Sequence, residues 1–188
     1  MKKKLARIIS EIMNGFATML LPMVITILIS DVSLKTKLLL SSYYLLAGIL
    51  PYIILRNFKK VSDYEFTDRK ERPPYFIILT VLFLIGYIFA KSTGNIQIEN
   101  VAYAQILITF VFTVVTFFWK ISGHLTYGTF FLCTLIYLFP ETNNLIYILF
   151  LIPPLSWSRV ALEKHTYLQT FAGTFLSLLF SFLIFQIL

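Results

Sequence analysis

Seven mostly apolar segments alternate with short polar stretches along the chain. A helix needs about 17–25 mostly apolar residues to cross the hydrocarbon core of a bilayer. The segments that reach or approach this length are 12–30, 38–55, 75–90, 101–119, 125–139, 145–157 and 167–188. The sixth is the weakest candidate, because it is short and contains Pro153 and Pro154, and proline interrupts helices. The pattern therefore predicts an all-α fold, a polytopic transmembrane helix bundle with six to seven spans.

The first segment follows the basic start Lys2-Lys3-Lys4, which is also how a cleaved signal peptide begins. No cleavage site of small residues follows the apolar run, so we interpret the segment as a retained membrane helix. Residues 2–7 are then expected to anchor the chain at the membrane interface. We expect 1–188 to be a single integral-membrane domain in which residues 63–188 carry the motifs described below.

The composition agrees with this pattern. Hydrophobic residues make up 58% of the chain and charged residues 13%, against about 45–50% and about 25% in an ordinary soluble domain. Such a chain has too little polar surface to coat a water-soluble globule. The composition also excludes a disordered chain, and the single cysteine, Cys133, excludes a disulfide scaffold.

The cations are unevenly distributed between the loops. The chain has 16 Lys and Arg against 9 Asp and Glu, but only Lys35, Lys37 and Lys91 fall in loops on the side opposite the N-terminus. By the positive-inside rule we expect a cell-membrane protein with a cytoplasmic N-terminus. No soluble module carries a basic patch, so membrane lipids rather than nucleic acid are the expected partners.

Three polar stretches, 56–74, 120–124 and 158–166, follow the second, fourth and sixth segments. Alternation of the spans places all three on the cytoplasmic side, where they can converge on one site. Both histidines, His124 and His165, begin a span on this side. Ionisable residues beside membrane spans are candidates for function, although an isolated histidine also often serves only to bond nearby backbone.

The surroundings of His165 favour a chemical role. Gln169 lies four residues later, one helical turn on, so the two side chains can meet. A glutamine carbonyl can accept a hydrogen bond from one ring N–H and leave the other ring nitrogen to act as a nucleophile. Upstream, Arg159 offers a planar fork of donors that suits phosphate oxygens.

The other two stretches supply further candidate groups. Ser122, Gly123 and His124 place a hydroxyl, an unshielded backbone N–H and an imidazole side by side. Arg69 and Arg72 are three residues apart and share a face if that stretch is helical.

At these residues the chain resembles the type 2 phosphatidic acid phosphatase superfamily, a family of integral-membrane lipid phosphatases. The third motif of that family is Ser-Arg, five residues, His, three residues, Asp. It matches from Ser158 through Arg159 to His165, with Gln169 in place of the aspartate. A neutral Gln169 stabilises an imidazolium less than an aspartate does, so we expect slower turnover unless a nearby acid such as Asp68 takes that role.

The other two motifs match less completely. The second, Pro-Ser-Gly-His, matches at 122–124 with Ile121 in place of the proline. The first, Lys, six residues, Arg-Pro, matches at Arg72 and Pro73, with Glu65 at the position of the lysine. A neighbouring cation, Arg69 or Lys70, would have to replace that lysine.

The resemblance implies a role for each of these residues. His165 would attack phosphorus to form a phosphohistidine, with Gln169 as its partner, and His124 would be the general acid. No metal and no other cofactor is implied. The residues expected to bind phosphate are Arg69, Lys70, Arg72, Lys120, Ser122, Gly123 and Arg159.

We therefore expect a lipid phosphatase that hydrolyses a phosphate monoester or diphosphate. Its substrate would be phosphatidic acid, a prenyl phosphate or diphosphate, or phosphatidylglycerophosphate. The alternative is a non-catalytic membrane protein that binds or moves phospholipid, since a fold does not imply a function. A Mg²⁺ site made by Asp63, Asp68 and Glu71 is a less favoured option, because carboxylates in a basic loop more often pair with their neighbours.

Overall fold

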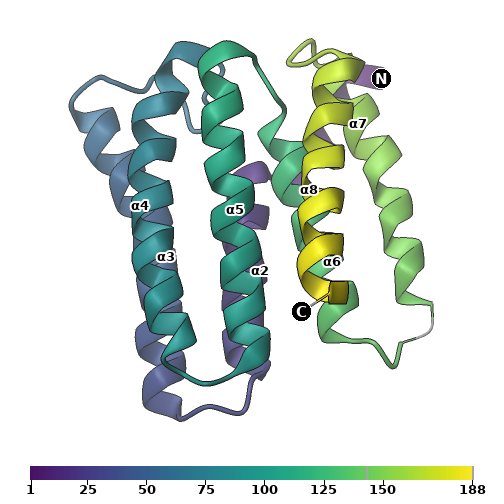
Figure 1. Cartoon of the computed structure of the whole chain (residues 1–188). Helices are drawn as coiled ribbons and strands as arrows, with labels where there is room; N and C mark the ends of the chain where they lie inside the picture. The colour runs from purple at the N-terminus through teal and green to yellow at the C-terminus, as the bar shows by residue number, and fades with distance from the viewer. Residues whose placement is uncertain (143, 188) are drawn as a thin grey trace. The chain divides into compact units, whose positions relative to one another are not determined.

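The computed structural model describes residues 1–142 and 144–187, apart from the side chain of residue 187, and this part of the chain is helical without strands (Figure 1). The predicted all-α fold is thus confirmed. The last residue of the seventh predicted segment, Leu188, lies outside the described residues. In chain order the helices are α1 (Lys2–Ile12), α2 (Gly15–Ile29), α3 (Leu34–Asn57), η1 (Arg69–Glu71), α4 (Arg72–Lys91), α5 (Ile96–Phe118), α6 (Gly123–Leu138), η2 (Leu145–Leu151), α7 (Ile152–Ala161) and α8 (Tyr167–Ile187).

Among the described residues, five helical stretches are long and apolar enough to cross a membrane: Lys2–Ile29, Leu34–Asn57, Arg69–Lys91, Ile96–Phe118 and Tyr167–Gln186. The predicted count of six to seven spans is therefore not confirmed. The fifth predicted segment forms α6, which has only 16 residues. The sixth splits at its proline pair into η2 and α7, as the interruption by Pro153 and Pro154 predicts.

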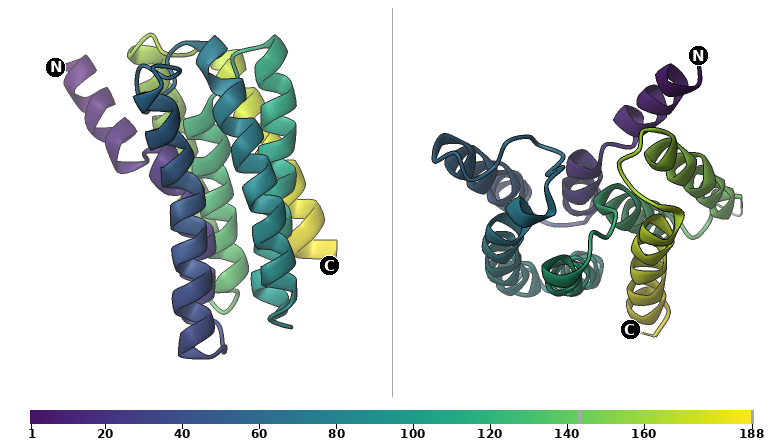
Figure 2. Two further views of the ribbon diagram at one scale, coloured as in Figure 1. Left: turned by 90° about the vertical axis from the view of Figure 1, so that its left-hand side faces the viewer. Right: turned by 90° about the horizontal axis from the view of Figure 1, so that it is seen from above.

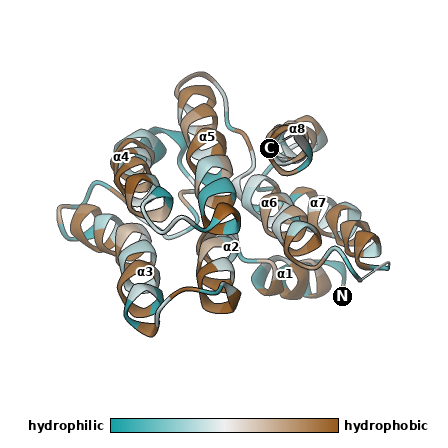
Figure 3. Ribbon diagram, turned by 60° about the horizontal axis from the view of Figure 1, so that its bottom comes forward, coloured by the Kyte–Doolittle hydropathy of each residue, from teal (hydrophilic) through white to brown (hydrophobic). Residues whose placement is uncertain are grey.

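Large apolar side chains are exposed along the long helices. Leu46 is 50% exposed on α3, Ile88 is 60% exposed on α4 and Phe182 is 63% exposed on α8. In Figure 3 the ribbons of α3 and α4 are accordingly mostly brown, the colour of hydrophobic residues. Exposed apolar surface of this extent is typical of a surface that meets lipid, and it is consistent with an integral membrane protein.

Packing divides the described chain into two compact units. We call residues 1–19 with 120–187 the histidine unit, because it contains both histidines, and residues 20–119 the second unit. The histidine unit holds α1, the start of α2, α6, η2, α7 and α8, and the second unit holds the rest of α2 and α3, α4 and α5. The expectation of a single domain stays a prediction.

Local polar residues set where several helices begin. The side chain of Asn14 accepts the N–H of Phe16 at 2.9 Å and so starts α2 after the break that ends α1. Ser33 and Asn95 cap α3 and α5 in the same way. These caps satisfy N–H groups that have no partner within the first turn of a helix.

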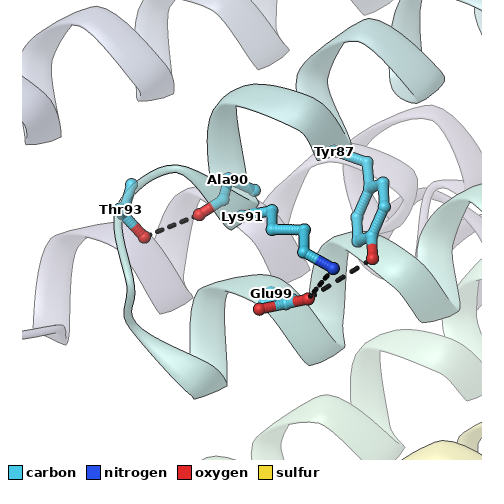
Figure 4. Close-up of polar contacts among 5 residues, drawn as sticks. All are labelled: Tyr87, Ala90, Lys91, Thr93 and Glu99. Carbon is cyan, nitrogen blue, oxygen red and sulfur yellow. Dashed lines mark hydrogen bonds and ion pairs between the residues drawn. The ribbon is translucent and has the colours of Figure 1, made fainter.

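The second unit is a bundle in which α3, α4 and α5 run side by side (Figure 2). The hydroxyl of Tyr75 on α4 donates to the carbonyl of Gly48 on α3 at 3.0 Å. At the turn between α4 and α5, Lys91 pairs with Glu99 at 3.4 Å (Figure 4). The hydroxyl of Tyr87 donates to the same carboxylate at 3.3 Å, so a polar cluster closes this end of the hairpin.

In the histidine unit α6 packs against α7, α8 and η2. Its core consists of Leu125 and Leu132 from α6, Leu155 from α7 and Met13 from the end of α1. Met13 and Leu155 thereby pack around Leu125, the residue that follows His124 in the first turn of α6.

Candidate functional site

His165 and Gln169 meet as the sequence predicts. His165 precedes α8 and is 8% exposed, and its Nδ1 lies 3.0 Å from Oε1 of Gln169. The same Oε1 accepts the backbone N–H of Thr166 at 3.2 Å, so it acts as an acceptor toward the ring as well. Nδ1 is then the donor in this hydrogen bond.

Gln169 also has a structural task that the sequence analysis missed. Thr166 precedes the first residue of α8, and its Oγ1 accepts the backbone N–H of Gln169 at 3.3 Å. Together with the bond from the Thr166 N–H to Gln169 Oε1, this makes a reciprocal capping box. The signal was present in the sequence as Thr, two residues, Gln before an apolar run. One side chain therefore both starts α8 and orients His165.

The spacing between Arg159 and His165 is set by the main chain. The N–H of Lys164 donates to the carbonyl of Arg159 at 3.0 Å, and the N–H of Glu163 donates to the carbonyl of Val160 at 2.9 Å. These are the two bonds of a Schellman motif at the end of α7. Glu163 takes the left-handed position, with a φ of 59°. The N–H of His165 also donates to the Arg159 carbonyl, at 3.3 Å.

The Arg159 side chain is buried in the histidine unit, at 2% exposure. Its Nη1 donates to Oγ of Ser10 on α1 at 2.5 Å. Ser10 is itself 2% exposed, and the sequence analysis did not single it out. Arg159 is thus fixed close to the His165 segment, with α1 as its support.

An exposed ion pair joins α1 to the same loop. Lys3 Nζ lies 2.7 Å from Oε1 of Glu163, with both side chains largely exposed. The hydrogen bond and the charge of Lys3 lower the pKa of the Glu163 carboxyl below its ordinary value. The segment 159–165 is therefore tied to α1 at two points, one buried and one exposed.

Small residues form a seam between α8 and α6. Oγ of Ser177 donates to the carbonyl of Thr126 at 2.5 Å. A Cβ placed on Gly173 would lie 2.7 Å from the carbonyl oxygen of Ser122, so only glycine permits this approach. The seam brings the start of α6 against the start of α8.

Ser122 lies directly beside Gln169. Its N–H donates to the Gln169 carbonyl at 3.2 Å. This backbone donor is therefore already engaged within the protein. Its hydroxyl is fully buried and has no hydrogen-bond partner among the described residues. Gly123 follows as the first residue of α6.

His124 occupies the first turn of α6 and is 7% exposed. Gly15, the first residue of α2, lies against it: a Cβ at Gly15 would come within 3.0 Å of His124 Nδ1. The N-terminal segment thus contacts the second motif as well as the third. The motif resemblance gave no indication of this contact.

A shallow, open cavity of about 590 Å³ lies beside His165. Besides His165 and Gln169, its lining includes the cations Lys120 and Lys164, and Tyr167. The structure therefore brings Lys120 to the third motif. Glu163 also lines the cavity, so two lysines stand against one carboxylate. A shallow cavity with this balance and an imidazole in its wall can accept an anionic headgroup.

The expected residues of the first motif lie in the second unit. Arg69 donates through Nη1 to the carbonyls of Thr116 and Phe117 at the end of α5. Arg72 is 3% exposed, and its Nε donates to the carbonyl of Phe66 at 3.0 Å. Lys70 is exposed. Their convergence with the histidines on one site stays a prediction.

The three acidic residues of the optional Mg²⁺ site are engaged locally. Asp68 accepts the N–H of Lys70 at 2.9 Å, and Glu71 accepts the hydroxyl of Ser62 at 2.9 Å. Asp63 accepts the N–H of Thr67. In the described part of the chain no group of three His, Cys, Asp or Glu side chains could hold a metal ion.

The chain matches no family model, and comparisons with curated proteins and with solved structures find no similar protein. The functional argument therefore rests on the chemistry and geometry of the site.

Proposed function

We propose that this chain is an integral-membrane lipid phosphatase with the chemistry of the type 2 phosphatidic acid phosphatases. The observation that carries the proposal is the pairing of His165 Nδ1 with Gln169, in a cavity that Lys120 and Lys164 also line. An imidazole oriented by a hydrogen bond at Nδ1, beside cations, is suited to attack a phosphate ester whose charge the cations balance.

In the proposed reaction Nε2 of His165 attacks phosphorus, and the bond from phosphorus to the lipid oxygen breaks. His124 protonates the leaving oxygen. Water then attacks the phosphohistidine while His124 takes its proton, and inorganic phosphate leaves as His165 is restored. Gln169 keeps its hydrogen bond with Nδ1–H through both steps, so the ring does not rotate. None of the steps uses a metal or another cofactor.

Several groups would hold the phosphoryl oxygens. The buried hydroxyl of Ser122 and the Gly123 N–H lie at the start of α6, where a helix favours anions. Lys120 contributes charge from the cavity wall. We assign Arg159 to the same role, together with the first-motif cations Arg69, Lys70 and Arg72.

The substrate is proposed to be a lipid that reaches the site from the bilayer. The exposed apolar surface of the long helices supports this entry route. Phosphatidic acid, a prenyl phosphate or diphosphate, and phosphatidylglycerophosphate all combine an apolar tail with the required phosphate. We further propose that α6 and the η2–α7 segment complete a bundle of six to seven spans in the cell membrane. The N-terminus and the site would then face the cytoplasm.

The test is phosphate release from these four lipids by the purified protein in detergent with EDTA. We expect release from at least one of them, and its loss in His165→Ala. Leu168→Ala is the matched control, because Leu168 lies in the first turn of α8, three residues after His165, and is 65% exposed. Release that depends on added divalent metal, or that persists in His165→Ala, would overturn the mechanism.

A second candidate function is binding or movement of phospholipid without turnover. The neutral Gln169, which also caps α8, favours it, because the residue is explained without any reaction. The same four lipids, tested with the wild type and with His165→Ala, distinguish the two functions. Headgroup binding that survives His165→Ala, without phosphate release from any lipid, would support the binding protein.

A further inference from the structure

Helix α1 has an exposed apolar stripe. Leu5 is 54%, Ile8 49% and Ile12 73% exposed. Together with Met1 they are spaced four, three and four residues apart, so they share one face of the helix. The opposite face buries Ala6 and Ser10 in the histidine unit, where α1 packs on α7. The helix therefore presents its apolar stripe outward.

Cations flank this stripe. Lys2, Lys4 and Arg7 are exposed, and Glu11 is the only acidic residue of the helix. Within the apolar stretch Lys2–Ile29, Met13 and Asn14 interrupt the helix between α1 and α2. With 11 residues α1 alone is too short to cross a bilayer. A helix that is apolar on one face, cationic beside it and too short to span fits the headgroup region of an anionic leaflet.

We propose that α1 is a docking surface for the anionic phospholipid headgroups of the leaflet beside the histidine unit. Charge complementarity selects this occupant: the stripe alone would enter any bilayer, but the cations beside it favour a negatively charged one. The bonds Arg159–Ser10 and Lys3–Glu163 connect this surface with the segment that carries His165. The proposal concerns a binding surface and does not require catalysis.

The test uses the full chain with Cys133→Ser and Ile8→Cys, labelled at position 8 with the fluorophore NBD. The protein is reconstituted into vesicles of phosphatidylcholine and into vesicles that contain about a third phosphatidylglycerol. Both kinds of vesicle contain a lipid with a nitroxide group, which quenches NBD fluorescence near the headgroups. We expect stronger quenching in the anionic vesicles, and loss of that difference in high salt, which screens the headgroup charge.

Charge variants make the test specific. Lys4→Gln with Arg7→Gln should abolish the difference between the two vesicles, whereas Lys4→Arg with Arg7→Lys should keep it. Lys59→Gln with Lys60→Gln, an equal loss of charge at exposed sites in the second unit, should also keep it. Equal quenching in both vesicles, or a difference that survives the neutralised α1, would overturn the proposal. So would self-quenching that rises with protein density, because a second copy would then cover the stripe.

The outcome is independent of phosphate release. His165→Ala should leave the lipid dependence of quenching unchanged, since His165 lies outside α1. Failure of the docking proposal and failure of the proposed phosphatase function therefore give different results.

Discussion

Gln169 Oε1 lies 3.0 Å from Nδ1 of His165 and 3.2 Å from the backbone nitrogen of Thr166. One acceptor thus fixes both the orientation of the imidazole and the first turn of α8. Replacements of Gln169 separate these two tasks, because glutamate can keep the capping bond and add a charge.

We predict that Gln169→Glu raises phosphate release about five- to tenfold, since a charge-assisted hydrogen bond is worth about 1 kcal/mol more than a neutral one. Gln169→Leu should lower release and destabilise the start of α8 by about 1 kcal/mol. Steady-state rates and thermal unfolding in the same detergent check both changes. Equal rates for wild type and Gln169→Glu would show that Gln169 serves the helix alone.

Gly173→Ala should separate α6 from α8, because the new methyl group would meet the Ser122 carbonyl at 2.7 Å. We expect a loss of about 1–3 kcal/mol in the free energy of unfolding. Gly128→Ala on α6 is the control: its methyl group would meet only the mobile ends of Leu155 and Met13, and alanine favours a helix. Denaturation in micelles measures both, and similar losses in the two variants would contradict the seam.

The pairing with Lys3 makes the stability contribution of Glu163 depend on pH. The folded pKa lies below the ordinary value of 4.5, so the pair stabilises the fold above that pH and is lost as the pH falls through the folded value. Carbon NMR of the labelled carboxyl should report a lowered pKa that returns toward 4.5 in Lys3→Gln. Lys2→Gln should leave it lowered. A Glu163 pKa that does not respond to Lys3→Gln would rule out the pair in solution.

Orientation can be tested at the two ends of α3. Lys35 lies in the first turn of α3, and Lys60 lies three residues after its last residue, Asn57. With Cys133→Ser as background, we expect an impermeant maleimide to label Lys35→Cys on intact cells, and Lys60→Cys only after permeabilisation. The reverse pattern would place the N-terminus and the site outside the cytoplasm. Labelling of both cysteines on intact cells would show that α3 does not span the membrane.

The sequence predicted the helices and the contacts that depend on helix geometry alone. The meeting of His165 with Gln169 followed from a spacing of four residues. The capping box followed from equally local rules but was not predicted, because Gln169 was considered only as the partner of His165.

Contacts between distant parts of the chain were not predictable in the same way. Ser10 and Arg159 are 149 residues apart, and nothing local to either residue indicates the other. Arg69 was expected to bind phosphate, yet it donates to carbonyls at the end of α5. The last carbonyls of a helix lack partners within the helix and attract any cation in reach, and sequence does not tell which cation that is.

The carbonyl of Arg159, which accepts the N–H groups of both Lys164 and His165, has a consequence for how this protein can vary. Because main-chain bonds hold the turn, substitutions at 160–164 other than proline, which lacks the N–H, leave the register between the guanidinium and the imidazole intact. An inserted or deleted residue would instead shift the imidazole out of register with the guanidinium, whatever the side chains are. Relatives of this chain should therefore tolerate change of composition in this loop but not change of length.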